Sequence, residues 1–214
     1  LPEAPSTALG EFVGYFAGDG AMSVNHRGTG RLILTVCNAE RDVAEHLVAA
    51  GETLFGLRPT PQRKKGDGST NYFYASTTLV HWLKHIGVDK PSALRVRVPE
   101  IAFRAGRDFA RAFLRGLFSA DGTVTREGYI ELASTSEGLA RDVQELLLSL
   151  GIPSHLGVET RRSGAFGKNP LYRLRIITQR GMKRFASDIG FLSRAKQERL
   201  GAVNGKAWEF NDVI

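Results

Sequence analysis

The sequence has 214 residues, of which 42% are hydrophobic, and it carries a formal net charge of +7 at pH 7. A chain of this size can bury the core of one or two domains. Its single cysteine excludes an intrachain disulfide, and no apolar run reaches the roughly 20 residues that span a bilayer. We therefore expect a cytoplasmic protein without a membrane partner, and the positive charge predicts a polyanionic partner.

The first predicted element is an apolar helix that ends at Asp19 and Gly20. Its glycines, Gly10, Gly14 and Gly18, fall four residues apart and therefore line one stripe of the helix. A glycine inside a helix costs about 0.5–1 kcal/mol relative to alanine, so three of them need a compensating gain. Because a stripe without side chains lets two helix backbones approach closely, we expect this stripe to pack against a second helix.

The rest of the first half predicts two strand regions and two helices. A strand is expected over residues 31–37, with Cys37 buried in it, and Asn38 is expected to cap a helix that continues to Ala50 and ends at Gly51. A basic stretch and an extended run then predict a hairpin, and a third helix closes the half; these segments are residues 58–65, 71–76 and the region around Trp82.

The second half repeats this plan in the same register. Ala112, Gly116 and Ala120 lie 102 positions after the three glycines, and Asp121 lies 102 positions after Asp19. The shared offset indicates a duplication, so the two small-residue stripes are expected to face each other. The aspartates that end the two helices would then lie side by side.

The remaining elements of the second half follow in the same order as in the first. They are a strand (129–133), a helix (139–150, capped by Ser136 or Thr135 and ended by Gly151), a basic stretch (161–168), an extended run (171–177) and a third helix around Phe185. In the extended run, Tyr172, Leu174 and Ile176 alternate with Arg173, Arg175 and Ile177, so the arginines are expected on one exposed face of a strand.

Two carboxylates held close together repel unless they share a proton or bind cations. A single Asp-Gly pair is most simply a tight turn, but two such pairs at one offset, each after the same helix, favour a shared site. A basic chain attracts a polyanion, and Mg²⁺ between carboxylates and phosphate oxygens is the usual arrangement for phosphodiester cleavage. The pattern therefore favours a divalent-metal site formed by Asp19 and Asp121.

The chain resembles the LAGLIDADG homing endonucleases in their single-chain, two-motif (DOD-type) form, and most nearly those embedded in inteins. The resemblance rests on the two nonapeptides at residues 12–20 and 114–122, and on the segments 86–99 and 189–198. It implies an α+β fold, a pseudo-twofold duplicated αββαββα arrangement whose two antiparallel sheets form a DNA-binding saddle. We expect an N-terminal half at residues 1–99, a linker at 100–105 and a C-terminal half at 106–214, with 201–214 as a linker or tail.

The resemblance also implies an activity and a site. The expected activity is metal-dependent hydrolysis of double-stranded DNA at a long recognition site, leaving short 3′ overhangs, with each half cutting one strand. The implied metal is Mg²⁺ or Mn²⁺, while Ca²⁺ would occupy the site without supporting cleavage. Its implied ligands are Asp19, Asp121 and the backbone carbonyls of Gly18 and Ala120. The implied catalytic lysines are Lys90 and Lys196, with Arg194 as the nearest rival to Lys196.

The exposed face of each sheet is the expected DNA contact surface, since strands can enter the major groove and Arg, Asn, Gln and Glu can contact base edges. The candidates are Asn25, His26, Arg27, Arg31, Arg58, Gln62, Arg63, Lys64, Lys65, Asn71 and Tyr72 in the first half, and Arg126, Glu131, His155, Arg161, Arg162, Lys168, Asn169, Tyr172, Arg173 and Arg175 in the second.

The alternative function is a non-cleaving nucleic-acid binder on the same scaffold, either an RNA maturase or a DNA-binding regulator. Retention of both aspartates argues against it. Two motifs in one chain supply both halves of the site, so a monomer suffices. The source is left open between an excised intein domain, which would have a host splicing domain as partner, an intron-encoded enzyme and a free-standing one.

Overall fold

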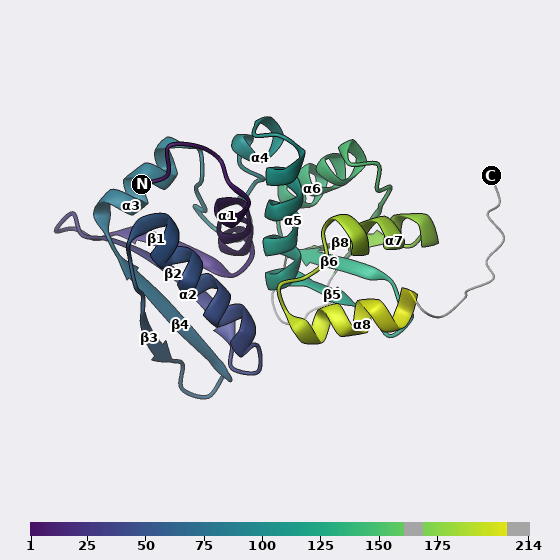
Figure 1. Cartoon of the computed structure of the whole chain (residues 1–214), viewed down its shortest axis with the longest axis horizontal. Coiled ribbons are helices and arrows are strands. Elements are labelled where there is room, and N and C mark those ends of the chain that lie inside the picture. Colours follow the sequence, from purple (N-terminus) through teal and green to yellow (C-terminus); the bar gives the residue numbers. More distant parts are fainter. Residues whose placement is uncertain (161–168, 205–214) are drawn as a thin grey trace.

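The computed structural model describes residues 1–160 and 169–204, which form two halves with the same order of elements (Figure 1). The first half comprises α1 (Thr7–Asp19), β1 (Gly20–Val24), β2 (Gly30–Cys37), α2 (Arg41–Phe55), β3 (Thr60–Arg63), β4 (Ser69–Ala75) and α3 (Thr77–His85). The second comprises α5 (Arg107–Asp121), β5 (Gly122–Val124), β6 (Ile130–Ser134), α6 (Glu137–Ser149), β7 (His155–Glu159), β8 (Leu171–Ile176) and α7 (Gln179–Asp188). Two further helices are α4 (Glu100–Arg104), within the segment predicted as a linker, and α8 (Arg194–Asn204).

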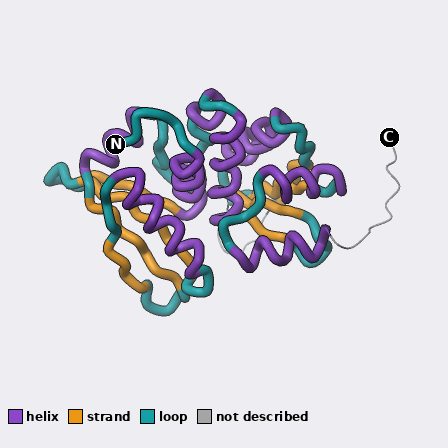
Figure 2. The backbone as a smooth tube through the Cα atoms, viewed as in Figure 1, coloured by secondary structure: helices purple, strands orange, loops and turns teal. Residues whose placement is uncertain are grey.

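Each half contains a four-stranded antiparallel sheet, and the two sheets have the same topology. Their strand orders are β1-β2-β4-β3 and β5-β6-β8-β7. Figure 2 shows one sheet on each side of the central pair of helices, α1 and α5. The duplicated αββαββα arrangement predicted from the sequence is therefore confirmed.

Helices cover one face of each sheet and form the core there. Along β2, Leu32, Leu34 and Val36 are buried while Arg31 and Cys37 are exposed, which is the alternation of a strand covered on one side. Aromatic rings pack in this core: Phe12 of α1 lies edge-on to Tyr74 of β4, and Phe118 of α5 lies edge-on to Phe185 of α7. The opposite face of each sheet is left without covering helices.

The first predicted helix after the sheet differs from the structure at both ends. Helix α2 begins at Arg41, because the side chain of Asn38 accepts a hydrogen bond from Thr70 at 2.7 Å and does not cap a helix. It continues through Gly51 and ends at Gly56, which has the left-handed φ of +64°. Cys37, predicted as buried, is exposed because it is the last residue of β2 on the uncovered face.

The other predicted boundaries hold more closely. Ser136 caps α6 by accepting a hydrogen bond from the backbone nitrogen of Leu139 at 3.2 Å, which decides between the two predicted caps. Tyr172, Leu174 and Ile176 alternate with Arg173 and Arg175 across β8, as predicted. Within the two described ranges, no helix combines the length and the apolar character needed to cross a bilayer.

Candidate functional site

The central helices touch along their small residues. An added Cβ atom at Gly14 would lie 2.0 Å from the carbonyl oxygen of Phe113, and one at Gly116 would lie 2.1 Å from the carbonyl oxygen of Glu11. At the carboxyl end, an added Cβ at Gly18 would lie 2.5 Å from the Cβ of Ala120. The two predicted stripes therefore face each other at backbone contact, and the helices are held together down to their last turn.

This packing brings Asp19 and Asp121 together at the ends of α1 and α5. An added Cβ at Gly18 would lie 3.1 Å from a carboxylate oxygen of Asp121, so that carboxylate lies against the last turn of α1. The side chain of Asp19 reaches solvent, whereas that of Asp121 is half-buried. Both lie at the junction between the two sheets, because each aspartate is followed directly by the first strand of its half.

The pKa values of both aspartates are raised. Desolvation and the nearby charge of Asp19 raise the pKa of Asp121 to about 7. The pKa of Asp19 is also raised by desolvation, although Lys90 and Lys196 act in the opposite direction. Without a cation between them, the two acids therefore resist ionising together.

The two predicted catalytic lysines lie at the same helix ends. Nζ of Lys90 donates a hydrogen bond to the carbonyl oxygen of Gly18, and Nζ of Lys196 donates to the carbonyls of Ser119 at 2.6 Å and Ala120 at 3.4 Å. The pKa of Lys90 is lowered by desolvation, although both aspartates act in the opposite direction. Arg194, the rival candidate, is exposed, and its backbone nitrogen donates a hydrogen bond to Asp42 at 2.6 Å.

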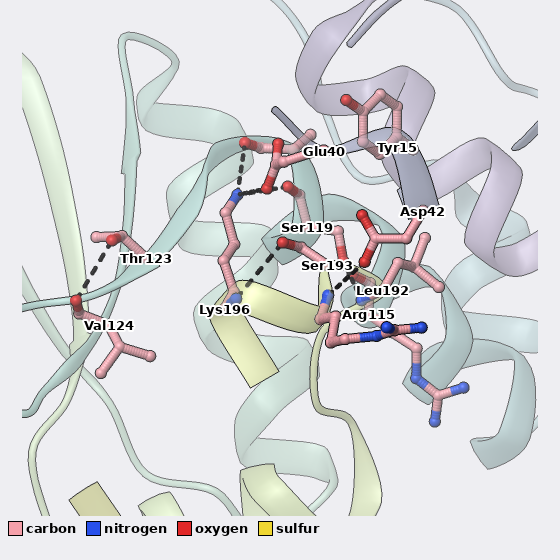
Figure 3. Close-up of polar contacts among 12 residues, drawn as sticks. Tyr15, Glu40, Asp42, Arg115, Ser119, Thr123, Val124, Leu192, Ser193 and Lys196 are labelled. Carbon is pink, nitrogen blue, oxygen red and sulfur yellow. Dashed lines mark hydrogen bonds and ion pairs between the residues drawn. The ribbon is translucent and has the colours of Figure 1, made fainter. Parts of the chain in front are cut away.

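A third carboxylate, Glu40, lies beside this site and was not predicted from the sequence. Figure 3 shows Lys196 extending from the second half toward Glu40 of the first, with Nζ 3.6 Å from a carboxylate oxygen. The pKa of Tyr15 is raised first by burial and then by the charges of Asp19, Glu40 and Asp121. The duplication could not reveal Glu40, because the corresponding cap of α6 is Ser136.

The uncovered face of the first sheet carries few charges. Strand pairing places Arg31, Thr35, Asn71 and Gln62 on it. Thr35 donates a hydrogen bond to Asn71 at 2.9 Å, and the guanidinium of Arg31 lies over the ring of Phe73 at 5.4 Å. Asn25, His26 and Arg27 are exposed in the turn between β1 and β2, beside this face.

The uncovered face of the second sheet is highly charged. Glu131, Arg173, Arg175 and His155 share it, because Glu131 pairs with Arg175 across the strands and Arg175 pairs with His155. Exposed Arg126 lies in the turn between β5 and β6. The structure thus gathers these predicted contact residues on one surface.

Four predicted contact residues lie elsewhere. Tyr72 pairs with Leu34 on the helix-covered face, and Tyr172 donates a hydrogen bond to Glu137 of α6 at 3.1 Å. Arg58 and Arg63 line a hollow of about 480 Å³ beside α2, where Arg58 pairs with Glu52. Strand register and the edge beside α2 turn these four side chains away from the uncovered face, so their contact with DNA stays a prediction.

The other predicted contacts lie at turns or outside the described residues. Lys64 pairs with Asp67 at the turn between β3 and β4, next to exposed Lys65. Asn169 is exposed just before β8. Arg161, Arg162 and Lys168 lie outside the described residues.

The donor set limits the kind of metal that the site could hold. Across residues 1–160 and 169–204, no group of three or more His, Cys, Asp or Glu side chains is arranged to bind a metal ion. What the helix ends offer is two carboxylates and neighbouring backbone carbonyls, all oxygen donors. Oxygen ligands completed by water or phosphate suit Mg²⁺, Mn²⁺ or Ca²⁺ and not the softer metals.

Curated proteins match this chain over short parts of their length. It is 29% identical over 211 residues to the glutamine–fructose-6-phosphate aminotransferase of Methanocaldococcus jannaschii, covering 96% of this chain but 18% of that protein. It is 32% identical over 196 residues to the DNA polymerase of Thermococcus litoralis, covering 89% and 11% respectively. With the replicative DNA helicase DnaB of Rhodothermus marinus the identity is 27%, covering 95% and 23%. The chain thus spans less than a quarter of each of these proteins.

Solved structures with the same fold cover most of both chains. The homing endonuclease I-DmoI superposes with a TM-score of 0.64 at 17% identity, covering 86% of this chain and 95% of that one. The N-terminal LAGLIDADG domain of DUF199/WhiA superposes with a TM-score of 0.57 at 15% identity, covering 89% and 86%. Residues 108–190 match the family model of the LAGLIDADG-like domain. Residues 108–190 are therefore similar to the LAGLIDADG-like domain, and the chain has the fold of the LAGLIDADG homing endonucleases.

Proposed function

We propose that this chain is a site-specific endonuclease that hydrolyses double-stranded DNA at a long recognition site and leaves short 3′ overhangs. The observation that carries the proposal is the pairing of Asp19 and Asp121 at the ends of two helices in backbone contact, each helix end also receiving a lysine. The uncovered faces of the two sheets flank this point, so a duplex lying on them would present a phosphate of each strand near the carboxylates.

The proposed cofactor is Mg²⁺ or Mn²⁺, with Ca²⁺ occupying the site without supporting cleavage. Asp19 and Asp121 would hold it, together with the carbonyl oxygens of Gly18 and Ala120. A bound divalent ion would activate water and stabilise charge on the scissile phosphate. The structures of I-DmoI in complex with DNA and manganese, and with DNA and calcium, support this choice by their fold.

Lys90 and Lys196 are proposed to assist the reaction from the same helix ends. A phosphoryl group gains negative charge as the transition state forms, and a fixed cation nearby lowers the barrier. Both ammonium groups already engage the helix-end carbonyls, so each is held close to where that charge develops. We propose one lysine for each strand.

An origin within an intein is supported by the curated matches. The matching proteins include an aminotransferase, a DNA polymerase and a helicase, which share no common reaction. Nearly all of this chain aligns with a small part of each, as expected if a mobile segment had been inserted into unrelated hosts. We propose that this chain is such a segment, acting as a monomer because it contributes both aspartates itself.

A non-cleaving binder on the same scaffold is the competing function. The superposition with the WhiA domain compares backbones alone, so the fold is compatible with a non-cleaving binder as well as with a nuclease. The side chains at the ends of α1 and α5 support the nuclease. Two carboxylates held close together repel unless a cation lies between them, so a metal-dependent nuclease has a use for the pair that a DNA-binding regulator lacks.

The test is a cleavage screen of the purified chain on a randomised duplex library with Mg²⁺, with an EDTA control and sequencing of the cut ends. The proposal predicts cuts in both strands at one rare, long site with short 3′ overhangs, and none in EDTA. Enrichment of one duplex without cutting would instead assign the chain to the DNA-binding regulators, and enrichment of RNA alone would assign it to the maturases.

A further inference from the structure

A buried carboxylate lies in the middle of the uncovered face of the second sheet. Glu131, on β6, is 5% exposed, although it belongs to the face that no helix covers. Its Oε2 accepts a hydrogen bond from Nε of Arg175 at 2.6 Å, and its Oε1 accepts one from Nη1 of Arg173 at 2.5 Å. Arg173 also pairs through Nε with Glu159 on β7 at 2.7 Å.

Strand register produces this cluster. Glu131 lies directly opposite Arg175 in the pairing of β6 with β8, and Arg173 follows two residues away on the same face. A buried carboxylate is costly unless it is paired, and Glu131 is paired on both oxygens. Arg173 and Arg175 cover the carboxylate of Glu131 on the side away from the core. Their guanidinium groups are held in place by these hydrogen bonds.

The two arginines remain partly exposed on the uncovered face of the second sheet. The side chains of Arg173 and Arg175 are 32% and 44% exposed. Arg175 contacts Glu131 through Nε, so this contact does not use its two terminal nitrogens. Two parallel N–H donors are what a guanine needs, because O6 and N7 on its major-groove edge accept a bidentate pair.

The charges of the cluster argue for base recognition over phosphate binding. Two arginines and two glutamates, Glu131 and Glu159, sum to no net charge, so the cluster adds little to the attraction for the DNA backbone. What it adds is fixed geometry. An arginine already held by a carboxylate loses less side-chain freedom when it binds a base.

We infer that Arg173 and Arg175, oriented by Glu131, bind guanines in the half of the target that lies under the second sheet. This inference rests on the proposed function and deepens it by assigning bases to one side of the site. Arg173 and Arg175 are the specificity-determining residues, and Glu131 is a positioning residue that acts through them.

The uncovered face of the first sheet indicates a different base preference in the other half of the target. Its uncovered face carries Arg31 over the ring of Phe73, the apolar Ile33, and the hydrogen-bonded pair Thr35 and Asn71. Apolar groups and amides contact thymine methyls and adenine edges. The guanine preference set by the Glu131 cluster therefore lies on one side of the cleavage point, and we expect an asymmetric target.

The experiment is a selection of bound duplexes from a randomised library in EDTA, using the full chain and its variants. Wild type is expected to enrich guanine at two neighbouring positions on one side of the target. Arg173→Ala and Arg175→Ala should each reduce the preference at one of these positions by roughly 5- to 150-fold. Glu131→Gln should reduce both preferences together and leave the other half-site unchanged.

Matched controls come from α6, where Glu137 and Arg141 form an exposed pair on the helix-covered side. Glu137→Gln and Arg141→Ala change the charge by the same amounts, and both should keep the full guanine preference. A structural role alone for Glu131 would lower the melting temperature and weaken binding to all duplexes equally.

Guanine preferences that survive in both arginine variants would overturn the inference and leave the proposed function standing. The inference would also be overturned if Glu131→Gln altered both half-sites to the same extent. Failure of wild type to enrich any duplex would overturn the proposed function, and this inference with it.

Discussion

Asp19 and Asp121 are the residues on which the functional account depends, and their surroundings explain why they are unusual. Close packing of α1 against α5 forces the carboxylates toward each other and removes part of their hydration, so the pKa of each is raised. Lys90, Lys196 and Glu40 surround them with further charge. The repulsion between the two carboxylates would be relieved by the divalent ion that we propose they bind.

The raised pKa of Asp121 predicts how stability depends on pH. Because the pKa in the folded state lies above its ordinary value, the contribution of the protonated carboxyl is full below about pH 4 and is lost as the pH rises through 7. In EDTA, the free energy of unfolding should fall by about 1–2 kcal/mol between pH 5.5 and pH 8. Asp121→Asn should remove most of this fall, which chemical denaturation at the two pH values would measure.

Each of the two lysines, Lys90 and Lys196, is predicted to assist cleavage of one DNA strand. Lys90→Met and Lys196→Met should each slow cleavage of one strand by about a hundredfold or more, leaving nicked product, because a cation near the developing charge is lost. Strand-labelled duplexes would resolve the two cuts. Lys84→Met, which removes an exposed lysine of α3, should cut both strands normally. Equal slowing of both strands by either variant would contradict the division between the halves.

At the scale of the elements, the paired helices set the geometry of the site. Glycine at positions 14 and 116 allows each backbone to touch the other, which a side chain of any size would prevent. The gain from this contact offsets the cost of glycine in a helix. Since both aspartates follow the last contact by a single turn or less, the spacing of the helices determines the spacing of the carboxylates.

Gly14→Ala should test this dependence. The new Cβ would lie 2.0 Å from the carbonyl oxygen of Phe113, which is backbone and cannot turn away. We expect a loss of stability of about 1–3 kcal/mol or more, with reduced cleavage as the helices separate. Gly201→Ala in α8 is the matched control, since nothing lies within 4 Å of its added Cβ. Its stability should be unchanged or higher.

The elements were largely predictable because their signals are local or repeated. The stripes, the Asp-Gly ends and the alternation in residues 171–177 follow from periodicity, and the structure confirms them. Gly51 was misinterpreted as a helix end because its role is tertiary: an added Cβ would lie 2.5 Å from the ring of Tyr74, whose hydroxyl donates to Leu47. The faces of Tyr72 and Cys37 depend on strand register, which composition does not reveal.

Part of the site could not be predicted from the sequence, because it depends on contacts between segments that are distant in the chain. Glu40 has no counterpart in the second half, and it meets Lys196 only because the two halves pack together. Glu131 was predicted as a base contact, yet its burial beneath Arg173 and Arg175 follows from the pairing of β6 with β8. Contacts between distant segments leave no periodic pattern in the chain.

At the scale of the whole molecule, the halves are interlocked by their closing segments. The end of the first half lies on α6, where Arg97 pairs with Asp142 at 2.6 Å and the hydroxyl of Ser136 donates to the carbonyl of Val96 at 2.7 Å. The end of the second half reaches back to α2, where Asp42 accepts a hydrogen bond from the start of α8. Each half thus delivers its lysine to the shared site on a segment that the other half supports.

A buried ionic contact adds to this connection. Glu11 of α1 is 7% exposed and accepts hydrogen bonds from Arg115 of α5 at 2.8 Å, while His46 of α2 lies 2.7 Å away. Arg115 also donates to the carbonyl of Ile189 at 2.6 Å. Arg115 therefore links the first central helix to the segment that follows α7.

The most direct test of the account compares wild type with the Asp19→Asn, Asp121→Asn double variant on the target found by the screen. Cleavage with Mg²⁺ and binding in EDTA would be measured on the same labelled duplex. We expect the double variant to bind the duplex at least as tightly as wild type and to cut neither strand, since it lacks the cation-binding charge but keeps the sheet faces. Full cleavage by the double variant would contradict the assignment of the paired aspartates as the metal site.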